Sequence, residues 1–324
     1  MSGRAPDVQV IGAGVCGLTT AICLAEAGLA VTIIAERLPP ETTSAAAGAI
    51  WGPHLVDLGG PAAGWGTSTL ATLRDLAGQP GTGVRMTDGI EARRRPAEPQ
   101  GWSGQVTGFR RCAPAELPDG FVAGWRYRSP VVTMPVYLRY LLDRFTRGGG
   151  DVQRGTLRSL AGDTRAPVVV NCTGAWARDL VPDHDVRPVR GQAVIVANPG
   201  VTEFFIGPAD EAGDLVYMFP HGDTVLLGGT EQAGDWNLDP DPADTRRILA
   251  GCAAVDPRLS GAQVLAVRVG LRPVRPRVRL AAERLGSGRL LVHNYGHGGG
   301  GVSLSWGCAR DVTGQVLARA GRAG

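Results

Sequence analysis

Residues 8–36, VQVIGAGVCGLTTAICLAEAGLAVTIIAE, form the stretch that decides the fold. A short apolar run over 8–11 predicts a strand, and apolar side chains at helical spacing over 18–25 predict a helix. Gly28 is typical of a helix C-terminal cap, and a second apolar run over 30–36 follows at once. Strand, glycine turn, helix and strand make the βαβ unit of a doubly wound, mostly parallel sheet.

The turn of this unit contains Gly12, Gly14 and Gly17 in the pattern G-x-G-x-x-G. The first glycine permits a tight turn, the second lets a pyrophosphate approach the backbone, and the third lets helix and strand pack closely. Glu36 follows 19 residues after Gly17, where a carboxylate binds ribose hydroxyls and would repel the 2′-phosphate of NADP. The pattern predicts a dinucleotide site; a turn that binds nothing and an NAD-linked dehydrogenase are the alternatives.

Length and composition are typical of a globular protein with two domains. The chain has 324 residues, of which 44% are hydrophobic and 19% charged. A net charge of +3, from 33 basic and 30 acidic residues, is too balanced for a nucleic-acid-binding protein. No apolar run reaches the roughly 20 residues that a membrane span needs. The chain contains no lysine, which excludes a Schiff base and a lysine general base.

The six cysteines show neither the CxxC spacing of a zinc site nor the paired clusters of a disulfide framework. We therefore expect no metal ion and a reduced intracellular compartment. The N-terminus lacks a basic and apolar signal region, and the C-terminal RAGRAG is not a peroxisomal signal. These features predict a cytoplasmic protein.

The rest of the chain predicts a second domain interleaved with the first. The stretch 51–129 is rich in Gly, Pro and Arg and predicts loops and short strands, and 134–150 predicts a helix with a glycine stop. Alternating segments over 189–229 predict antiparallel strands. A strand over 290–296 and a helix after Gly301 then return to the first domain.

We therefore expect an α/β fold in which a discontinuous Rossmann-like nucleotide domain comprises 1–52, 131–188 and 272–324. A mainly antiparallel α+β cap domain, which binds the substrate, comprises 53–130 and 189–271.

Five further motifs occur in a fixed order: TTSAAAGAIWGP, VVVNCTGAWA, RGQ, GLRPVRPRVRL and HNYGHGGGGVSLSWG. With the opening stretch, they make the chain resemble the D-amino-acid oxidase family of FAD flavoenzymes nearly end to end. The resemblance implies non-covalent FAD and a D-amino acid and dioxygen as substrates, and it leaves a homodimer open. It implies hydride transfer from the substrate α-carbon to flavin N5, reoxidation by dioxygen, and release of a 2-oxo acid, ammonia and hydrogen peroxide, with no acid–base residue.

The resemblance also implies roles for individual residues. Arg272 in GLRPVRP matches the arginine that binds the substrate carboxylate, which a planar guanidinium holds bidentately. Tyr217 matches a tyrosine that binds the same carboxylate, Gly299 offers its carbonyl to the amine, and His54 bears on the accepted side chain. The residues implied at the cofactor are Gly12, Gly14, Val15, Cys16, Gly17, Glu36, Arg37, Thr42, Thr43, Ser44, Ala47, Gly48, Thr156, Thr173, Gly174, Arg272, Gly298, Gly301, Val302 and Ser303.

Four consecutive glycines, 298–301, precede the last predicted helix. We expect them to let the main chain lie against a flat isoalloxazine ring, where a Cβ would collide. The helix that follows would direct its N-terminal N–H groups toward the pyrimidine end of the flavin. A flexible linker is the alternative interpretation.

Two residues give conflicting indications of the substrate side chain. His54 resembles a histidine of the D-aspartate oxidase branch, whereas Glu231 stands where that branch has an arginine. A carboxylate at Glu231 would repel a second substrate carboxylate, which favours neutral D-amino acids. Gly213 occupies the place of a lid tyrosine in animal members, so the presence of a lid stays open. The alternatives are acidic D-amino acids, a glycine or sarcosine type of amine oxidase, and a nucleotide-holding protein without turnover.

Overall fold

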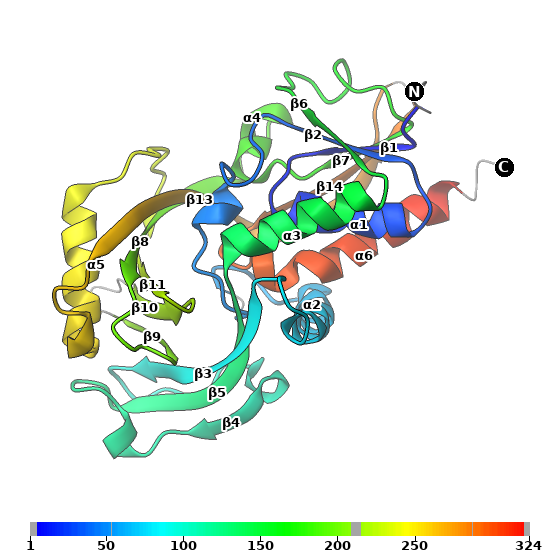
Figure 1. The fold of residues 1–324 in the computed structure, drawn as a ribbon. Helices are drawn as coiled ribbons and strands as arrows, with labels where there is room; N and C mark the ends of the chain where they lie inside the picture. The colour runs from blue at the N-terminus through cyan, green and yellow to red at the C-terminus, as the bar shows by residue number, and fades with distance from the viewer. Residues whose placement is uncertain (1–4, 53, 209–214, 287, 321–324) are drawn as a thin grey trace.

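A computed structural model describes residues 5–52, 54–208, 215–286 and 288–320. One continuous sheet runs through the molecule, with the strand order β4-β5-β3-β9-β10-β11-β8-β13-β14-β7-β1-β2-β6 (Figure 1). The β6 end of this sheet is parallel and the β4 end is mainly antiparallel. The predicted α/β class with a mixed sheet is confirmed.

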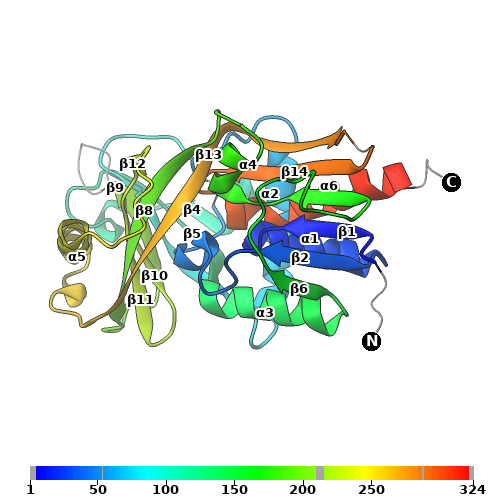
Figure 2. The same cartoon turned by 90° about the horizontal axis from the view of Figure 1, so that it is seen from above.

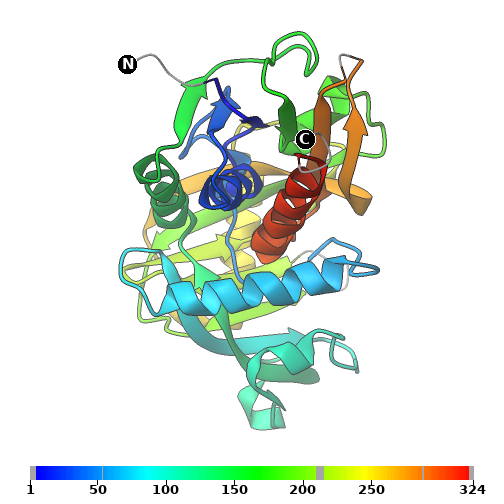
Figure 3. The same cartoon turned by 90° about the vertical axis from the view of Figure 1, so that its right-hand side faces the viewer.

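The parallel end grows from the unit expected at the N-terminus. β1 (Val8–Ile11) pairs in parallel with β2 (Val31–Ala35), and α1 (Val15–Glu26) connects them. Three further parallel pairs extend this part: β6 (Asp151–Arg154) with β2, β7 (Val168–Asn171) with β1, and β14 (Leu290–His297) with β7. Figure 3 shows α1, α3 (Met134–Arg147) and α6 (Gly301–Ala320) side by side beneath these strands.

The antiparallel end is built around one long strand. β13 (Val264–Arg284) pairs with β8 (Arg187–Ala197) through its first part and with β14 through its last part, so it joins the two ends of the sheet (Figure 2). Beyond β8 the sheet contains β11 (Thr224–Gly228), β10 (Leu215–Pro220), β9 (Phe204–Pro208), β3 (Val84–Arg93), β5 (Ala123–Val132) and β4 (Thr107–Arg111). The two-residue β12 (Gln232–Ala233) pairs with the start of β8.

The stretch 51–129 is more regular than expected. It contains α2 (Ala62–Ala77), a helix of 16 residues, and two strands of 10 residues, β3 and β5. The helix escaped prediction because glycines, threonines and serines interrupt its apolar face. That face still buries Trp65, Leu70, Leu73 and Leu76. The expectation of loops and short strands was therefore wrong for most of this stretch.

α2 packs on α6, which bears on the predicted division into domains. The Trp65 indole donates to Asp311 at 3.0 Å, and the Gly307 amide donates to the Thr69 hydroxyl at 3.0 Å. A Cβ on Gly307 would lie 2.3 Å from the Trp65 backbone, so glycine sets this close approach. Part of the stretch 53–130 thus contacts a helix of the stretch 272–324, and the domain boundaries stay a prediction.

α5 (Pro242–Val255), which the sequence analysis did not predict, packs on β8, β10 and β11. Asp241 caps its N-terminus by accepting from the Ala243 amide at 2.7 Å. All six cysteines lie in the described residues and are free. None of the described helices is long and apolar enough to cross a membrane, and the described residues include no group of three or more His, Cys, Asp or Glu suited to a metal ion.

Candidate active site

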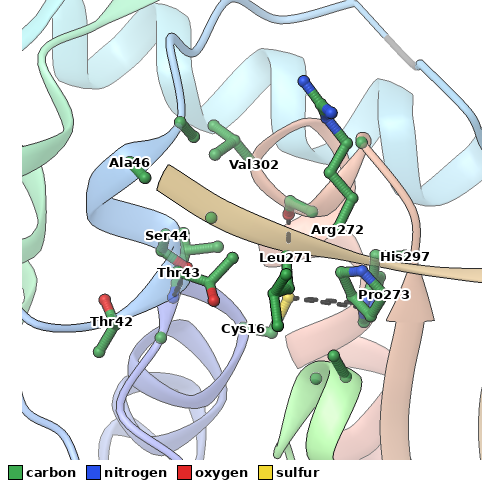
Figure 4. A pocket seen from close by; sticks show the side chains of 18 of the residues that line it. Cys16, Thr42, Thr43, Ser44, Ala46, Leu271, Arg272, Pro273, His297 and Val302 are labelled. Atoms are coloured by element: carbon green, nitrogen blue, oxygen red, sulfur yellow. Dashed lines mark hydrogen bonds between the residues drawn. The ribbon is translucent and has the colours of Figure 1, made fainter. Parts of the chain in front are cut away.

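A cavity of about 690 Å³ lies where the carboxyl ends of the parallel strands meet the antiparallel part of the sheet. Ligands of open α/β sheets bind at this edge. Much of its lining comes from the β1–α1 turn, the end of β2, residues 42–50, the residues that follow β7, one face of β10, and short stretches of β8 and β13. Figure 4 shows part of this lining, including Thr42, Thr43 and Ser44 near the start of α1.

The glycine turn after β1 adopts a conformation that only glycine fits. Gly12 has a φ of +108°, and a Cβ there would lie 2.5 Å from the carbonyl oxygen of Cys172, which follows β7. A Cβ on Gly17 would lie 1.9 Å from the carbonyl oxygen of Gly12, so Gly17 serves the packing of α1 against the turn. The Ser44 hydroxyl accepts from the Val15 amide at 3.0 Å and thereby joins residues 42–50 to the helix start.

Two polar atoms in the lining have no partner within the described part of the chain. They are Oγ1 of Thr42 and Oδ1 of Asn294, both buried. Buried polar atoms in folded proteins are almost always hydrogen-bonded. The absence of a protein partner for these two atoms among the described residues fits a cavity that binds a polar ligand. The exposed residues Glu36 and Arg37 also line this cavity.

Arg272 and Tyr217 meet in the cavity although they lie on different strands. Nη1 of Arg272 donates to the Thr230 carbonyl at 2.9 Å, and the guanidinium contacts the Tyr217 hydroxyl. Burial raises the pKa of Tyr217, and the charge of Arg272 partly offsets that rise. Both side chains therefore stand ready as hydrogen-bond donors at neutral pH.

Bare backbone makes room for this pair. A Cβ on Gly228 would lie 2.1 Å from the Tyr217 ring, and one on Gly229 would lie 2.5 Å from its hydroxyl. A Cβ on Gly191 would lie 2.5 Å from Nη1 of Arg272. Three glycines on neighbouring segments thus fix where the guanidinium and the phenol can lie.

The glycine run before α6 packs against the segment that follows Trp51. A Cβ on Gly298, which has a φ of +53°, would lie 1.9 Å from the Leu55 carbonyl. On Gly299 it would lie 2.8 Å from the His54 ring, and on Gly300 it would lie 2.9 Å from Val56. Close packing within the protein therefore already requires glycine at positions 298, 299 and 300. The contact with an isoalloxazine ring stays a prediction.

His54 and Glu231, which gave conflicting indications of the substrate side chain, are hydrogen-bonded to one another. Nε2 of His54 is hydrogen-bonded to Oε1 of Glu231. Burial tends to raise the pKa of Glu231, but the hydrogen bond from His54 and the nearby Arg272 charge outweigh it and lower the pKa. His54 lines the cavity, whereas Glu231 is not among its lining residues. Gly213, at the place of a lid tyrosine, lies outside the described residues.

Almost every residue that the resemblance implied lines this one cavity. The exceptions are Gly17, which lies against Gly12, and Ser303, whose buried hydroxyl accepts from the Gly52 amide at 3.1 Å. His297 is buried beside Cys16, with Nδ1 3.6 Å from the thiol sulfur (Figure 4), and burial lowers its pKa to about 4. The positions fit the implied roles, which remain predictions.

The sequence analysis missed several lining residues. Among them are Glu91, Gln100, Trp102 and Tyr127, from the stretch that we expected to be irregular, and Ile206 on β9. No short motif marks them, and Glu91 comes to lie beside Ile206 through the pairing of β3 with β9.

Comparison with known proteins agrees with this geometry. Residues 7–315 match the family described as FAD dependent oxidoreductase. The chain is 48% identical to a D-amino-acid oxidase of Rubrobacter xylanophilus, covering 94% of this chain and 93% of that protein. It is 42% identical to one of Streptomyces coelicolor, covering 95% and 96%. It is 37% identical to a D-aspartate oxidase of Homo sapiens, covering 94% and 93%.

Solved structures with lower identity share the fold. A glycine oxidase of Geobacillus kaustophilus has a TM-score of 0.78 at 20% identity, covering 96% of this chain and 95% of that one. An L-α-glycerophosphate oxidase of Mycoplasma pneumoniae with FAD bound has a TM-score of 0.77 at 14% identity, covering 98% and 95%. From its sequence relatives and the family match, this chain belongs to the FAD-dependent oxidoreductase family, together with the D-amino-acid oxidases.

Proposed function

We propose that this protein is an FAD-dependent oxidase of D-amino acids that carry no carboxylate in the side chain. Its products are the 2-oxo acid, ammonia and hydrogen peroxide. The observation that carries the proposal is the pairing of Arg272 with Tyr217 in the cavity that begins at the glycine turn. A module that held FAD without turnover would have no use for a site that binds carboxylates.

The residues of the cavity fit FAD. The β1–α1 turn with Gly12 and Gly14 would receive the pyrophosphate, the orphaned hydroxyl of Thr42 would donate to a phosphate or ribose oxygen, and Glu36 would bind the ribose. When bound, FAD supplies a hydride acceptor and passes the electrons to dioxygen. The protein contributes binding and orientation.

Three contacts would define the handedness of the substrate. Arg272 and Tyr217 bind its carboxylate, and the carbonyl of Gly299 accepts a hydrogen bond from its amine. With these two groups fixed, only one enantiomer directs its α-hydrogen toward the flavin while its side chain extends into the cavity. No side chain needs to act as a base; the nearby His297 is buried against Cys16, and burial lowers its pKa to about 4, which makes it a weak base.

The exclusion of substrates with a side-chain carboxylate rests on Glu231. Its lowered pKa keeps it negatively charged, and its hydrogen bond to His54 holds that charge beside the cavity. A second carboxylate on the substrate would be repelled there. Oxidation of acidic D-amino acids is the second candidate, favoured by the human D-aspartate oxidase among the relatives. A homodimer and a cytoplasmic location remain predictions from the sequence.

Peroxide release tests the proposal. The purified holoprotein is mixed in air with D-alanine, D-aspartate or L-alanine, and hydrogen peroxide and the 2-oxo acid are measured. We expect both products, in equal amounts, from D-alanine alone. Turnover of D-aspartate in preference to D-alanine would move the assignment to the second candidate, and no turnover of any D-amino acid would refute the proposal.

A further inference from the structure

Four side chains in the lining of the cavity form a hydrogen-bonded group that the proposed roles leave unused. They are Glu91, Gln100, Trp102 and Tyr127, here called the Glu91 wall. The Glu91 side chain is 7% exposed and carries a carboxylate on the face of β3 that lines the cavity. Burying a carboxylate costs free energy unless it is paired or hydrogen-bonded, so the groups that contact Glu91 matter.

The register of the sheet relates the Glu91 wall to the carboxylate-binding residues. Tyr217 lies opposite Ile206 in the pairing of β10 with β9, and Ile206 lies opposite Glu91 in the pairing of β9 with β3. Residues that lie opposite one another point to the same face of a sheet, and adjacent strands are about 5 Å apart. Glu91 therefore lies two strands, roughly 10 Å, from Tyr217, with Ile206 between them in the same lining.

After the hydrogen bonds within the Glu91 wall are counted, the atoms that can still bind a ligand are mainly hydrogen-bond acceptors. Oε1 of Glu91 accepts from Arg93 and, at 3.0 Å, from Gln100, whereas Oε2 accepts only from the Tyr127 hydroxyl, at 3.0 Å, among the described residues. The amide oxygen of Gln100 accepts from the Trp102 indole at 2.9 Å. A carboxylate oxygen, a phenol oxygen and an amide oxygen each have a further lone pair, so the wall suits a donor.

The composition of the lining points the same way. Arg93 pairs with Glu91 and offsets its charge, but Arg93 is not among the described residues that line the cavity, so what the wall presents to the cavity is acceptor oxygens. Ile206 contributes an apolar side chain to the same lining, between Tyr217 and Glu91 in the register of the sheet.

We propose that the Glu91 wall is a side-chain subsite that recognises a hydrogen-bond donor, an ammonium or a primary amide, at the end of a long D-amino acid side chain. The inference rests on the proposed function, because it takes the substrate carboxylate to be held by Arg272 and Tyr217. The apolar part of the side chain passes Ile206, and its terminal donor reaches Oε2 of Glu91. A terminal carboxylate in the same place faces acceptors, which cannot donate to it, so it is disfavoured.

Isosteric substrates test the subsite without any variant. D-Ornithine and D-norleucine have side chains of the same length, ending in an ammonium and a methyl group, and D-glutamine and D-glutamate differ by an amide in place of a carboxylate. We expect the wild-type holoenzyme to show a higher kcat/KM for the donor in each pair. Equal values within either pair, or preference for D-norleucine or for D-glutamate, would overturn the inference. Failure of all D-amino acids would instead refute the proposed function.

The variant Glu91→Gln then assigns the preference to this side chain. It keeps the shape of Glu91 but removes the charge and one acceptor, so we expect the ratio of kcat/KM for D-ornithine to that for D-norleucine to fall about tenfold or more. Glu203→Gln is the matched control, because Glu203 is 48% exposed and binds Arg126 on the surface. An unchanged ratio in Glu91→Gln overturns the inference; if this variant does not retain FAD, the wild-type substrate pairs decide.

Discussion

Replacing Arg272 by alanine should impair substrate binding while leaving the fold and the flavin in place. Within the protein, the change removes the hydrogen bond from Nη1 to the Thr230 carbonyl and the contact with the Tyr217 hydroxyl. A guanidinium has five N–H donors, so four remain for a bound carboxylate after the bond to Thr230. The alanine variant therefore leaves that carboxylate with Tyr217 alone, in a partly buried cavity.

The size of the effect follows from the chemistry of such pairs. Truncating one partner of a buried, hydrogen-bonded charge pair costs about 2 to 5 kcal/mol. This corresponds to an increase of about 30-fold to several thousandfold in the apparent dissociation constant of the substrate. Arg272→Lys should recover part of the loss, because an ammonium restores the charge but not the bidentate geometry.

Anaerobic titration of the flavin spectrum with D-alanine measures this effect directly, and steady-state KM measures it during turnover. Arg277→Ala is the matched control, because Arg277 lies on the same strand, is 84% exposed and pairs with Asp57 at 3.5 Å. We expect the control to bind D-alanine like the wild type. An Arg272→Ala protein that keeps its flavin and shows an unchanged KM would refute the assignment of the carboxylate site.

Four further changes have defined outcomes. Tyr217→Phe keeps the ring but loses a hydrogen bond to a charged group, so the apparent affinity for D-alanine should fall about tenfold to a hundredfold in the same titration; equal affinity would exclude the hydroxyl from the site. Gly191→Ala places a methyl group 2.5 Å from Nη1 of Arg272 and should raise KM with little change in Tm; an unchanged KM would show that the guanidinium adapts freely. Arg190→Met removes a buried guanidinium that pairs with Asp244 on α5 at 3.0 Å and donates to the Asn237 and Asp239 carbonyls; Asp244 keeps Arg247 at 2.9 Å, but the two carbonyls lose this donor, so urea unfolding should show a loss of about 2 to 5 kcal/mol; a loss under 1 kcal/mol would contradict this role. Burial lowers the pKa of His221 to about 4, whereas an unfolded histidine titrates near 6.5, so the unfolded state binds more protons between these pH values. Stability is then full above pH 6.5 and falls by up to about 3 kcal/mol as the pH drops to 4, and His221→Gln should flatten that part of the profile in denaturant titrations; an equal slope in the variant would contradict the prediction.

The sequence predicted the parts of the fold that local chemistry encodes. Gly12 and Gly17 are recognisable because a tight turn and a close helix approach admit no side chain, and the structure shows both constraints. α3 was predicted from its apolar periodicity and its glycine stop. α2 was missed because its apolar residues are separated by small and polar ones, and its stability depends on packing against α6, which no local pattern reveals.

Local sequence patterns also predict only part of the candidate site. Arg272 could be selected among neighbouring arginines only through a family motif, since nothing local separates it from the surface residue Arg277. The hydrogen bond between His54 and Glu231 joins residues 177 positions apart, so the sequence presented them as two conflicting indications. Glu91 reaches the cavity through the register of β3 with β9, which depends on the whole sheet.

The spectrum of the purified protein under anaerobic conditions tests the central claim most directly. The protein should show oxidised flavin, and D-alanine should bleach it whereas L-alanine should not, because only the D enantiomer can satisfy Arg272, Tyr217 and the Gly299 carbonyl with its α-hydrogen toward the flavin. Bleaching by D-alanine alone would establish the cofactor, the half-reaction and the handedness together. A flavin spectrum that neither enantiomer nor D-aspartate changes would contradict the proposed function.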